Sequence, residues 1–167
     1  MGSEPVKIAI NAYFSSEAAE MYCIVAGATV LGACSVILWL KFSDRFSFAL
    51  CWSLAVIALL LAATGVSLLI RDGQNHQSLI KIIDSGEPEL IESVVGAEQQ
   101  RMKKVADNYQ NLRYMFASFA LIAALLVAFT HHHVSHAIAV ALLVFAMAGL
   151  VIDRYSEVRA RTYLSEL

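Results

Sequence analysis

The sequence is poor in charge and in proline. Of its 167 residues, 16% are Asp, Glu, Lys or Arg, two are proline, and the formal net charge is −2. The basic residues form no contiguous patch, so nothing favours nucleic-acid binding. Hydrophobic residues make up 59% of the chain and the mean hydropathy is +0.64, well above the balance of a soluble domain. We therefore expect an integral membrane protein.

Cysteine is also scarce, which limits disulfide and thiolate-metal chemistry. Cys23, Cys34 and Cys51 all fall in apolar stretches, and none of them forms a CxxC pair. Thiols in this setting usually act as small packing side chains. The three cysteines therefore predict neither a disulfide framework nor a redox site.

Charge is missing altogether from four long stretches, residues 21–40, 46–70, 114–130 and 134–152. A hydrocarbon core of about 30 Å is crossed by about 20 helical residues, so each stretch is long enough to span. In lipid, the backbone groups must be satisfied within the segment, which favours helices. The pattern predicts an all-α integral membrane four-helix bundle built from two transmembrane hairpins, residues 21–70 and 114–152.

The charged remainder divides into three segments. Residues 1–20 are expected to form an N-terminal interfacial segment, residues 71–113 a cytoplasmic helical insert between helices 2 and 3, and residues 153–167 a cytoplasmic C-terminal helix. Ser15 or Ser16 is predicted to cap the first spanning helix. Glu17 and Glu20 would then lie in its first turn, where the helix dipole favours acidic side chains.

The distribution of basic residues predicts the topology. The two ends and the insert together carry ten of the twelve Lys and Arg residues, whereas the opposite loops carry only Lys41 and Arg45. Because cytoplasmic loops are enriched in positive charge, both termini and the insert are expected in the cytoplasm of a bacterial inner membrane.

Apolar residues of the insert recur at alternating spacings of four and three, which is typical of a coiled-coil-like seam. This interaction seam consists of Ile91, Val95, Met102, Val105, Tyr109, Leu112 and Phe116. Glu98 is its one polar member. The seam predicts a single helix from about Pro88 to about Thr130, about 60 Å long and projecting beyond the bilayer.

Small residues mark the expected contacts between helices, because they let backbones approach closely in lipid. The predicted packing positions are Ala28, Gly32, Gly65, Ala120, Ala124, Ala128 and Gly149.

One cluster of histidines is the only candidate metal site in the sequence. His131, His132, His133 and His136 lie in the predicted turn between the third and fourth spans, and imidazole suits Zn, Cu or Ni. No Cys or carboxylate nearby completes a ligand set, so we expect a polar turn without metal. The sequence also lacks charge within the spans, a phosphate-binding glycine loop and an HExxH motif. No catalytic residue and no cofactor are expected.

These features favour a non-enzymatic protein that binds another protein in or at the membrane, or associates with itself. Small four-span immunity proteins against pore-forming toxins are similar in outline, as are accessory subunits of membrane complexes. This similarity concerns architecture and rests on no shared motif. One alternative is a self-assembling channel or membrane-disrupting effector, gated by its cytoplasmic helices, with Ser53, Thr64 and Ser67 lining a path. A weaker alternative is a small metal transporter using the histidines.

Overall fold

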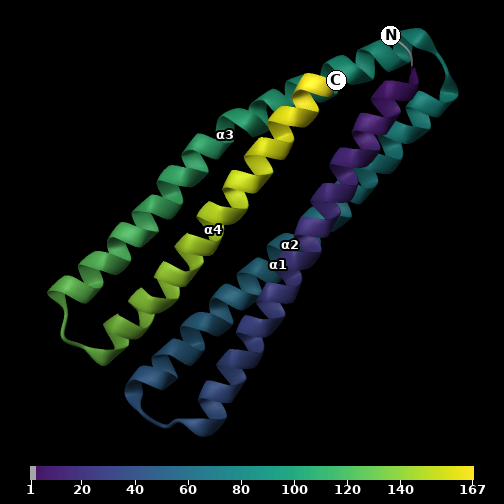
Figure 1. The fold of residues 1–167 in the computed structure, drawn as a ribbon. Helices are drawn as coiled ribbons and strands as arrows, with labels where there is room; N and C mark the ends of the chain where they lie inside the picture. Colours follow the sequence, from purple (N-terminus) through teal and green to yellow (C-terminus); the bar gives the residue numbers. More distant parts are fainter. Residues whose placement is uncertain (1–2) are drawn as a thin grey trace.

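The computed structural model describes residues 3–167, which form four helices joined by short turns (Figure 1). In chain order they are α1 (Ser3–Lys41), α2 (Arg45–Ser85), α3 (Pro88–Phe129) and α4 (His133–Glu166). Each is long and apolar enough to cross a membrane, and the described residues contain no strand. The all-α prediction with four long apolar helices is confirmed.

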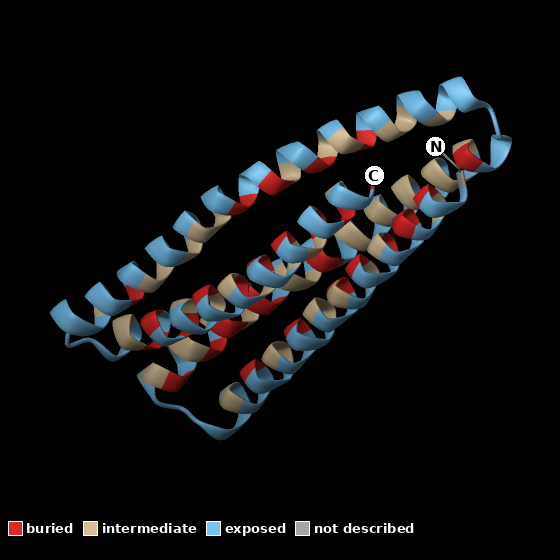
Figure 2. Cartoon of the chain, turned by 45° about the horizontal axis from the view of Figure 1, so that its top comes forward, coloured by how far each residue is buried: buried red, intermediate tan, exposed pale blue. Residues whose placement is uncertain are grey.

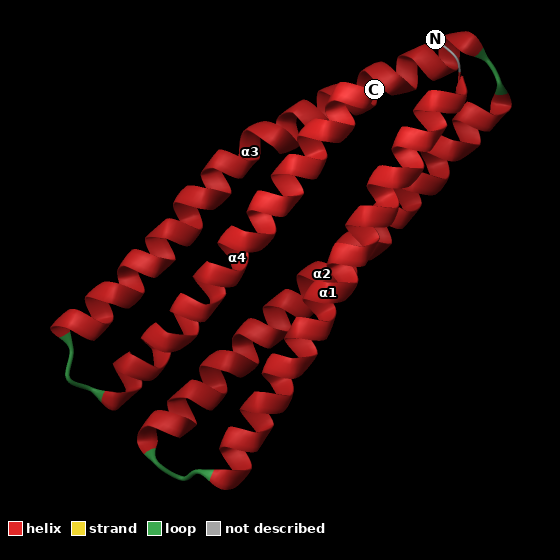
Figure 3. Ribbon diagram, in the orientation of Figure 1, coloured by secondary structure: helices red, strands yellow, loops and turns green. Residues whose placement is uncertain are grey.

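The helices pair as two hairpins whose turns lie at one end of the molecule (Figure 3). Both chain ends and the α2–α3 connection lie toward the opposite end (Figure 1). Asp44 caps α2, because its Oδ2 accepts a hydrogen bond from the Ser47 backbone N–H at 3.0 Å. Gly86 ends α2 at φ 74°, a left-handed conformation that suits glycine, and Pro88 then begins α3.

The structure does not show residues 71–113 as a separate insert. Residues 71–85 continue α2 beyond its apolar run, and residues 88–113 are the first part of α3. Gly73 does not end the helix, because a glycine inside a helix costs only about 1 kcal/mol. Burial of the helix beyond Gly73 compensates for that cost. Ile83, for example, is 4% exposed in the core near the termini.

The predicted helix start at Ser15 or Ser16 is wrong. Helix α1 begins at Ser3 and continues without interruption to Lys41. Val6, Ile10 and Phe14 do not lie along an interface, because they are buried against the other three helices. Within the predicted N-terminal segment, residues 1 and 2 lie outside the described part of the chain.

Most of the packing lies within each hairpin, α1 along α2 and α3 along α4, and the two hairpins meet mainly through α2 and α4. Buried positions follow the inner faces of the helices, and the outer faces are exposed (Figure 2). The larger core joins all four helices: Val6, Ala9, Ile10 and Phe14 of α1, Ile83 of α2, Met102 and Tyr109 of α3, and Ala160, Tyr163 and Leu167 at the end of α4. A smaller core in the apolar half joins Leu54 and Ile57 to Ala141.

One glycine in each hairpin packs closely against the neighbouring helix, Gly65 in the first hairpin and Gly149 in the second. A methyl group added at Gly65 would lie 2.9 Å from Cγ2 of Val25, and one at Gly149 would lie 2.3 Å from Cε1 of Phe116. Both positions were predicted as packing sites, and Ala28, 3% exposed, is another. Gly32 is different, because a methyl group there would meet nothing within 4 Å.

Candidate functional site

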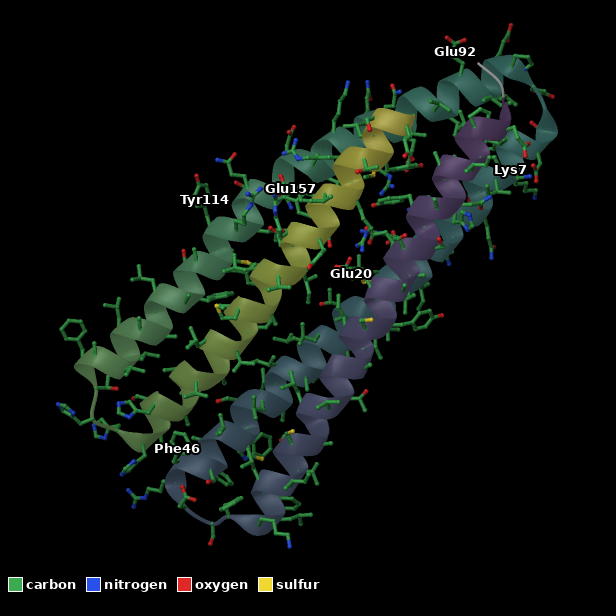
Figure 4. All side chains as sticks on the ribbon, in the orientation of Figure 1. Lys7, Glu20, Phe46, Glu92, Tyr114 and Glu157 are labelled. Atoms are coloured by element: carbon green, nitrogen blue, oxygen red, sulfur yellow. The ribbon has the colours of Figure 1, made fainter. Side chains whose placement is uncertain are left out.

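Charged side chains gather between the helices just beyond the apolar runs, on the side of the chain ends (Figure 4). On α1, Glu17 is buried and accepts a hydrogen bond from Nη2 of Arg159 of α4 at 3.3 Å. Arg159 also pairs with Glu20, whose Oε1 accepts a hydrogen bond from the Ser156 hydroxyl at 2.7 Å. Both glutamates therefore tie α1 to α4. The predicted role for them in a first helical turn is wrong.

A second charged group joins α3 to α4 around Glu157, which is 3% exposed. Arg113 donates to its Oε2 at 2.8 Å and Arg161 to its Oε1 at 2.9 Å, while Arg154 lies 3.3 Å away. Burial alone would raise the pKa of Glu157, but the Arg161 hydrogen bond and the Arg113 charge outweigh it and lower the pKa. Glu157 therefore stays ionised as the centre of three arginines.

Asp153, one turn before Glu157, has a poorer environment. It is 4% exposed, and neither of its carboxylate oxygens has a hydrogen-bond partner among residues 3–167. The one nearby cation is Arg113, whose Nε lies 3.7 Å from Oδ2, beyond hydrogen-bond distance. Burial raises the pKa of Asp153, Arg113 opposes that shift and Glu157 adds to it.

A third polar group lies deeper in the core near the termini. Glu98 of α3 accepts hydrogen bonds from Nε and Nη2 of Arg101 at 2.7 and 2.6 Å. The buried Tyr163 hydroxyl donates to Glu98 at 3.3 Å, and the Tyr163 ring stacks on Tyr13 with centroids 4.2 Å apart. Burial, and secondarily the Glu98 charge, raise the pKa of Tyr163. Glu98, the polar member of the seam, is therefore hydrogen-bonded within the fold, by Arg101 and Tyr163.

A cavity of about 520 Å³ opens between the two hairpins beside these groups. We call it the inter-hairpin cavity. Its polar wall comprises Tyr13, Glu17, Glu20, Thr64, Arg71, Asp72, Arg101, Asn108, Tyr109, Asp153 and Ser156. Its larger apolar wall includes Met21, Ile24, Leu60, Leu61, Leu68, Met115, Phe116, Phe145 and Ile152. A volume of this size lies within the range of about 300–1,000 Å³ that is usual for small-molecule sites.

The interaction seam faces the chain's own core. Met102 and Tyr109 are buried, and the other five members are half-buried. Val95, Val105 and Leu112 pack against the core cluster to which α1 and α4 contribute. Intramolecular packing therefore covers much of the seam.

The histidines do not come together as a ligand set. His131, His132 and His133 are exposed, and Nε2 of His136 lies 2.8 Å from the Thr130 carbonyl oxygen. Among the described residues, no group of three or more His, Cys, Asp or Glu side chains is placed to hold a metal ion.

The predicted alanine stripe of α3 is only partly a packing face. Ala120 is half-buried, whereas Ala124 and Ala128 are exposed and Ala123 is the buried residue instead. Of the predicted hydroxyl face, Ser53 donates to the Ala49 carbonyl of its own helix, and Thr64 lines the inter-hairpin cavity.

The inter-hairpin cavity does not follow from the sequence pattern. Its walls come from all four helices, and no local spacing links Glu20 to Asp153. One signal was present, because Glu20 and Asp153 directly flank apolar runs, where carboxylates need partners.

No family model, curated protein or solved structure matches this chain. The geometry of its own residues is therefore the ground for a functional proposal.

Proposed function

We propose that this chain is a non-enzymatic, multi-pass membrane protein that acts by binding a transmembrane helix of another protein. The observation that carries the proposal is the apolar half of α3. Between Tyr114 and Phe129, Ala123 is the only buried residue, and Ala124 and Ala128 face away from the bundle. Exposed small residues four apart are a surface on which a second helix can pack closely in lipid.

The arrangement of the two hairpins supports this assignment. Ion pairs and the larger core join all four helices near the termini, whereas α1 and α3 make the least contact of any helix pair. Contacts near the termini therefore hold the two hairpins together, whereas the apolar half of α3 is held chiefly by α4. A partner helix can approach α3 without displacing a helix of this chain.

A position-specific cross-linking experiment tests the proposal in native membranes. A photo-reactive phenylalanine analogue at Ala124 should give an adduct with one defined protein, identified by mass spectrometry. The same analogue at Val151, an exposed residue in the apolar run of α4, is the matched control and should not. Ala128→Ile in the Ala124 probe protein should remove the adduct, because the bulkier side chain keeps a second helix away. Lipid adducts alone at both positions would exclude a partner helix on this face.

A second copy of this chain in the adduct would favour the alternative, a self-assembling channel. The seam offers little surface for that assembly, because Met102 and Tyr109 are buried in the larger core and the other five members are half-buried. Bilayer conductance of the purified protein would then be the deciding measurement. The immunity and accessory-subunit roles differ only in the identity of the captured protein.

The proposed location is the bacterial inner membrane with both ends in the cytoplasm. The positive-inside distribution supports this orientation, and so does the placement of both hairpin turns at the end opposite the α2–α3 connection (Figure 1). Cysteines introduced at Ser43 and Ser93, in a variant lacking the three native cysteines, should label from opposite sides of the membrane. Labelling from the same side would contradict the topology.

A further inference from the structure

Asp153 is a buried carboxylate whose hydrogen-bonding capacity the fold leaves unused. Its side chain is 2% exposed, it lines the inter-hairpin cavity, and both oxygens lack hydrogen-bond partners among the described residues. Buried charges are normally paired and hydrogen-bonded, because burial without compensation is costly. Arg113 comes nearest to supplying them: its Nη2 donates to Glu157, and its Nε, which also lacks a hydrogen-bond partner, lies 3.7 Å from Oδ2 of Asp153.

The charges that line the cavity leave a surplus of carboxylate. On α1, Glu17 and Glu20 share one cation, Arg159. On α2, Arg71 and Asp72 pair with each other at 2.8 Å, and on α3, Arg101 is held by Glu98. On α4, Asp153 has only the distant Arg113. The polar wall therefore suits a cation, and one with N–H groups to donate.

The other wall of the same cavity is apolar. It is lined by residues of the uncharged runs, on the side of the carboxylates that faces the hairpin turns: Ile24 of α1, Leu60 of α2, and Met115 and Phe116 of α3. Glu20 and Asp153 each directly border one of these runs. Polar and apolar walls are thus arranged along the same direction as the head and tail of an amphiphile in a bilayer.

We propose that the inter-hairpin cavity binds an amphiphilic amine, with the ammonium group donating hydrogen bonds to Asp153 and the alkyl chain lying along Ile24, Leu60 and Met115. Ser156 lies one turn after Asp153 on the same face of α4, and its hydroxyl donates a hydrogen bond to Glu20. This hydrogen bond holds the Glu20 carboxylate beside the proposed ammonium position. This site is separate from the exposed face of α3 on which the proposed function rests.

The test is binding of dodecylamine to the purified full chain in phosphatidylcholine nanodiscs, followed by native mass spectrometry. Three probes separate the contributions of head and tail: dodecanol lacks the charge, dodecyltrimethylammonium lacks the N–H donors, and ethanolamine lacks the tail. Dodecylamine should bind saturably and with one molecule per chain. Each of the other three should bind at least about tenfold more weakly, because a hydrogen bond to a charged group contributes about that factor and burial of an alkyl tail contributes more.

Asp153→Asn should weaken dodecylamine binding about tenfold or more, whereas Glu92→Gln, which removes an exposed carboxylate far from the cavity, should leave it unchanged. Ala148→Phe, which puts bulk into the cavity wall, should weaken binding without touching a carboxylate. It keeps the test decisive if Asp153→Asn does not fold. Equal binding by folded Asp153→Asn, equal binding of the trimethylammonium probe, or no saturable binding would each overturn the proposal.

A competition arm identifies the source of the amine. If phosphatidylethanolamine in the nanodisc displaces dodecylamine, the natural ligand is a lipid headgroup. If dodecylamine binding is undiminished, the ligand is a free amphiphile. Either result supports the site only when Asp153→Asn, or Ala148→Phe if the first variant does not fold, weakens the binding that is measured.

Discussion

Replacing Gly149 with alanine probes the contact that holds α3 against α4. The new methyl carbon would lie 2.3, 2.4 and 2.6 Å from three carbons of the Phe116 ring. Carbon atoms pack best at about 3.5–4.0 Å, so the ring must retreat by about 1 Å or more. Phe116 cannot do so freely, because its ring already packs edge-on against Phe145 with centroids 5.7 Å apart.

The expected cost follows from that overpacking. Adding a methyl group to a well-packed contact typically destabilises a protein by about 1–3 kcal/mol. Gly149→Ala should lower the unfolding free energy by about that amount, measured by detergent-driven unfolding followed by circular dichroism. Gly32→Ala is the matched control: it also lies in an apolar run, but a methyl group there meets nothing within 4 Å. That variant should be neutral or stabilised by about 0.5–1 kcal/mol, since alanine favours the helix.

A double-mutant cycle isolates the contact itself. Phe116→Leu removes Cε1 and Cζ, the two ring carbons nearest to the new methyl group, so Gly149→Ala should cost less in that background. A coupling energy of about 1 kcal/mol or more is expected for residues in direct contact. If Gly149→Ala is as stable as Gly32→Ala, or if the two changes at the contact are additive, the close packing of α3 on α4 is wrong.

Three further predictions concern the charged end. Burial raises the pKa of Asp153 above 3.8, so the folded state binds this proton more tightly than the unfolded state does. The contribution of Asp153 to stability therefore falls as the pH rises from 3.8 through the pKa of the folded state. Asp153→Asn should therefore melt at the same temperature as wild type or higher at pH 7, with the gap narrowing toward pH 4; a less stable variant at pH 7 would contradict this. Glu98→Ala should lower the unfolding free energy by about 1–3 kcal/mol, because it strands Arg101, whose partial exposure limits the cost; the exposed Glu92→Ala should change it by less than about 0.5 kcal/mol. Val105→Asp should lower the melting temperature of the chain in detergent, since it puts an unpaired charge into the larger core, and unaltered stability would refute the packing of the seam.

Much of the architecture could be predicted from composition and spacing. Four uncharged runs predicted four helices, and the 4–3 spacing from Ile91 to Phe116 marked one apolar face along α3. Both signals are local, since a helix turn and a run of 20 apolar residues are visible within one segment. The helix break at Gly86 and Pro88 was equally local, because each residue acts through its own backbone geometry.

The identity of each packing partner was not a local property. The spacing of the seam does not say whether a second chain or α1 and α4 will cover it. Alanines four apart do not say which face of α3 meets α4. The carboxylates at the ends of the apolar runs looked like capping groups until the fold set Glu17 and Glu20 against Arg159, 139 or more residues away along the chain.

The sequence by itself determined which segments are helical and which parts of them suit lipid, because hydrophobicity and helix periodicity act within a single segment. The tertiary structure alone decided that the seam is internal, that part of the alanine stripe faces outward, and that Asp153 is buried without a hydrogen-bond partner. Burial and pairing depend on which helices pack side by side, and here residues more than 100 positions apart meet.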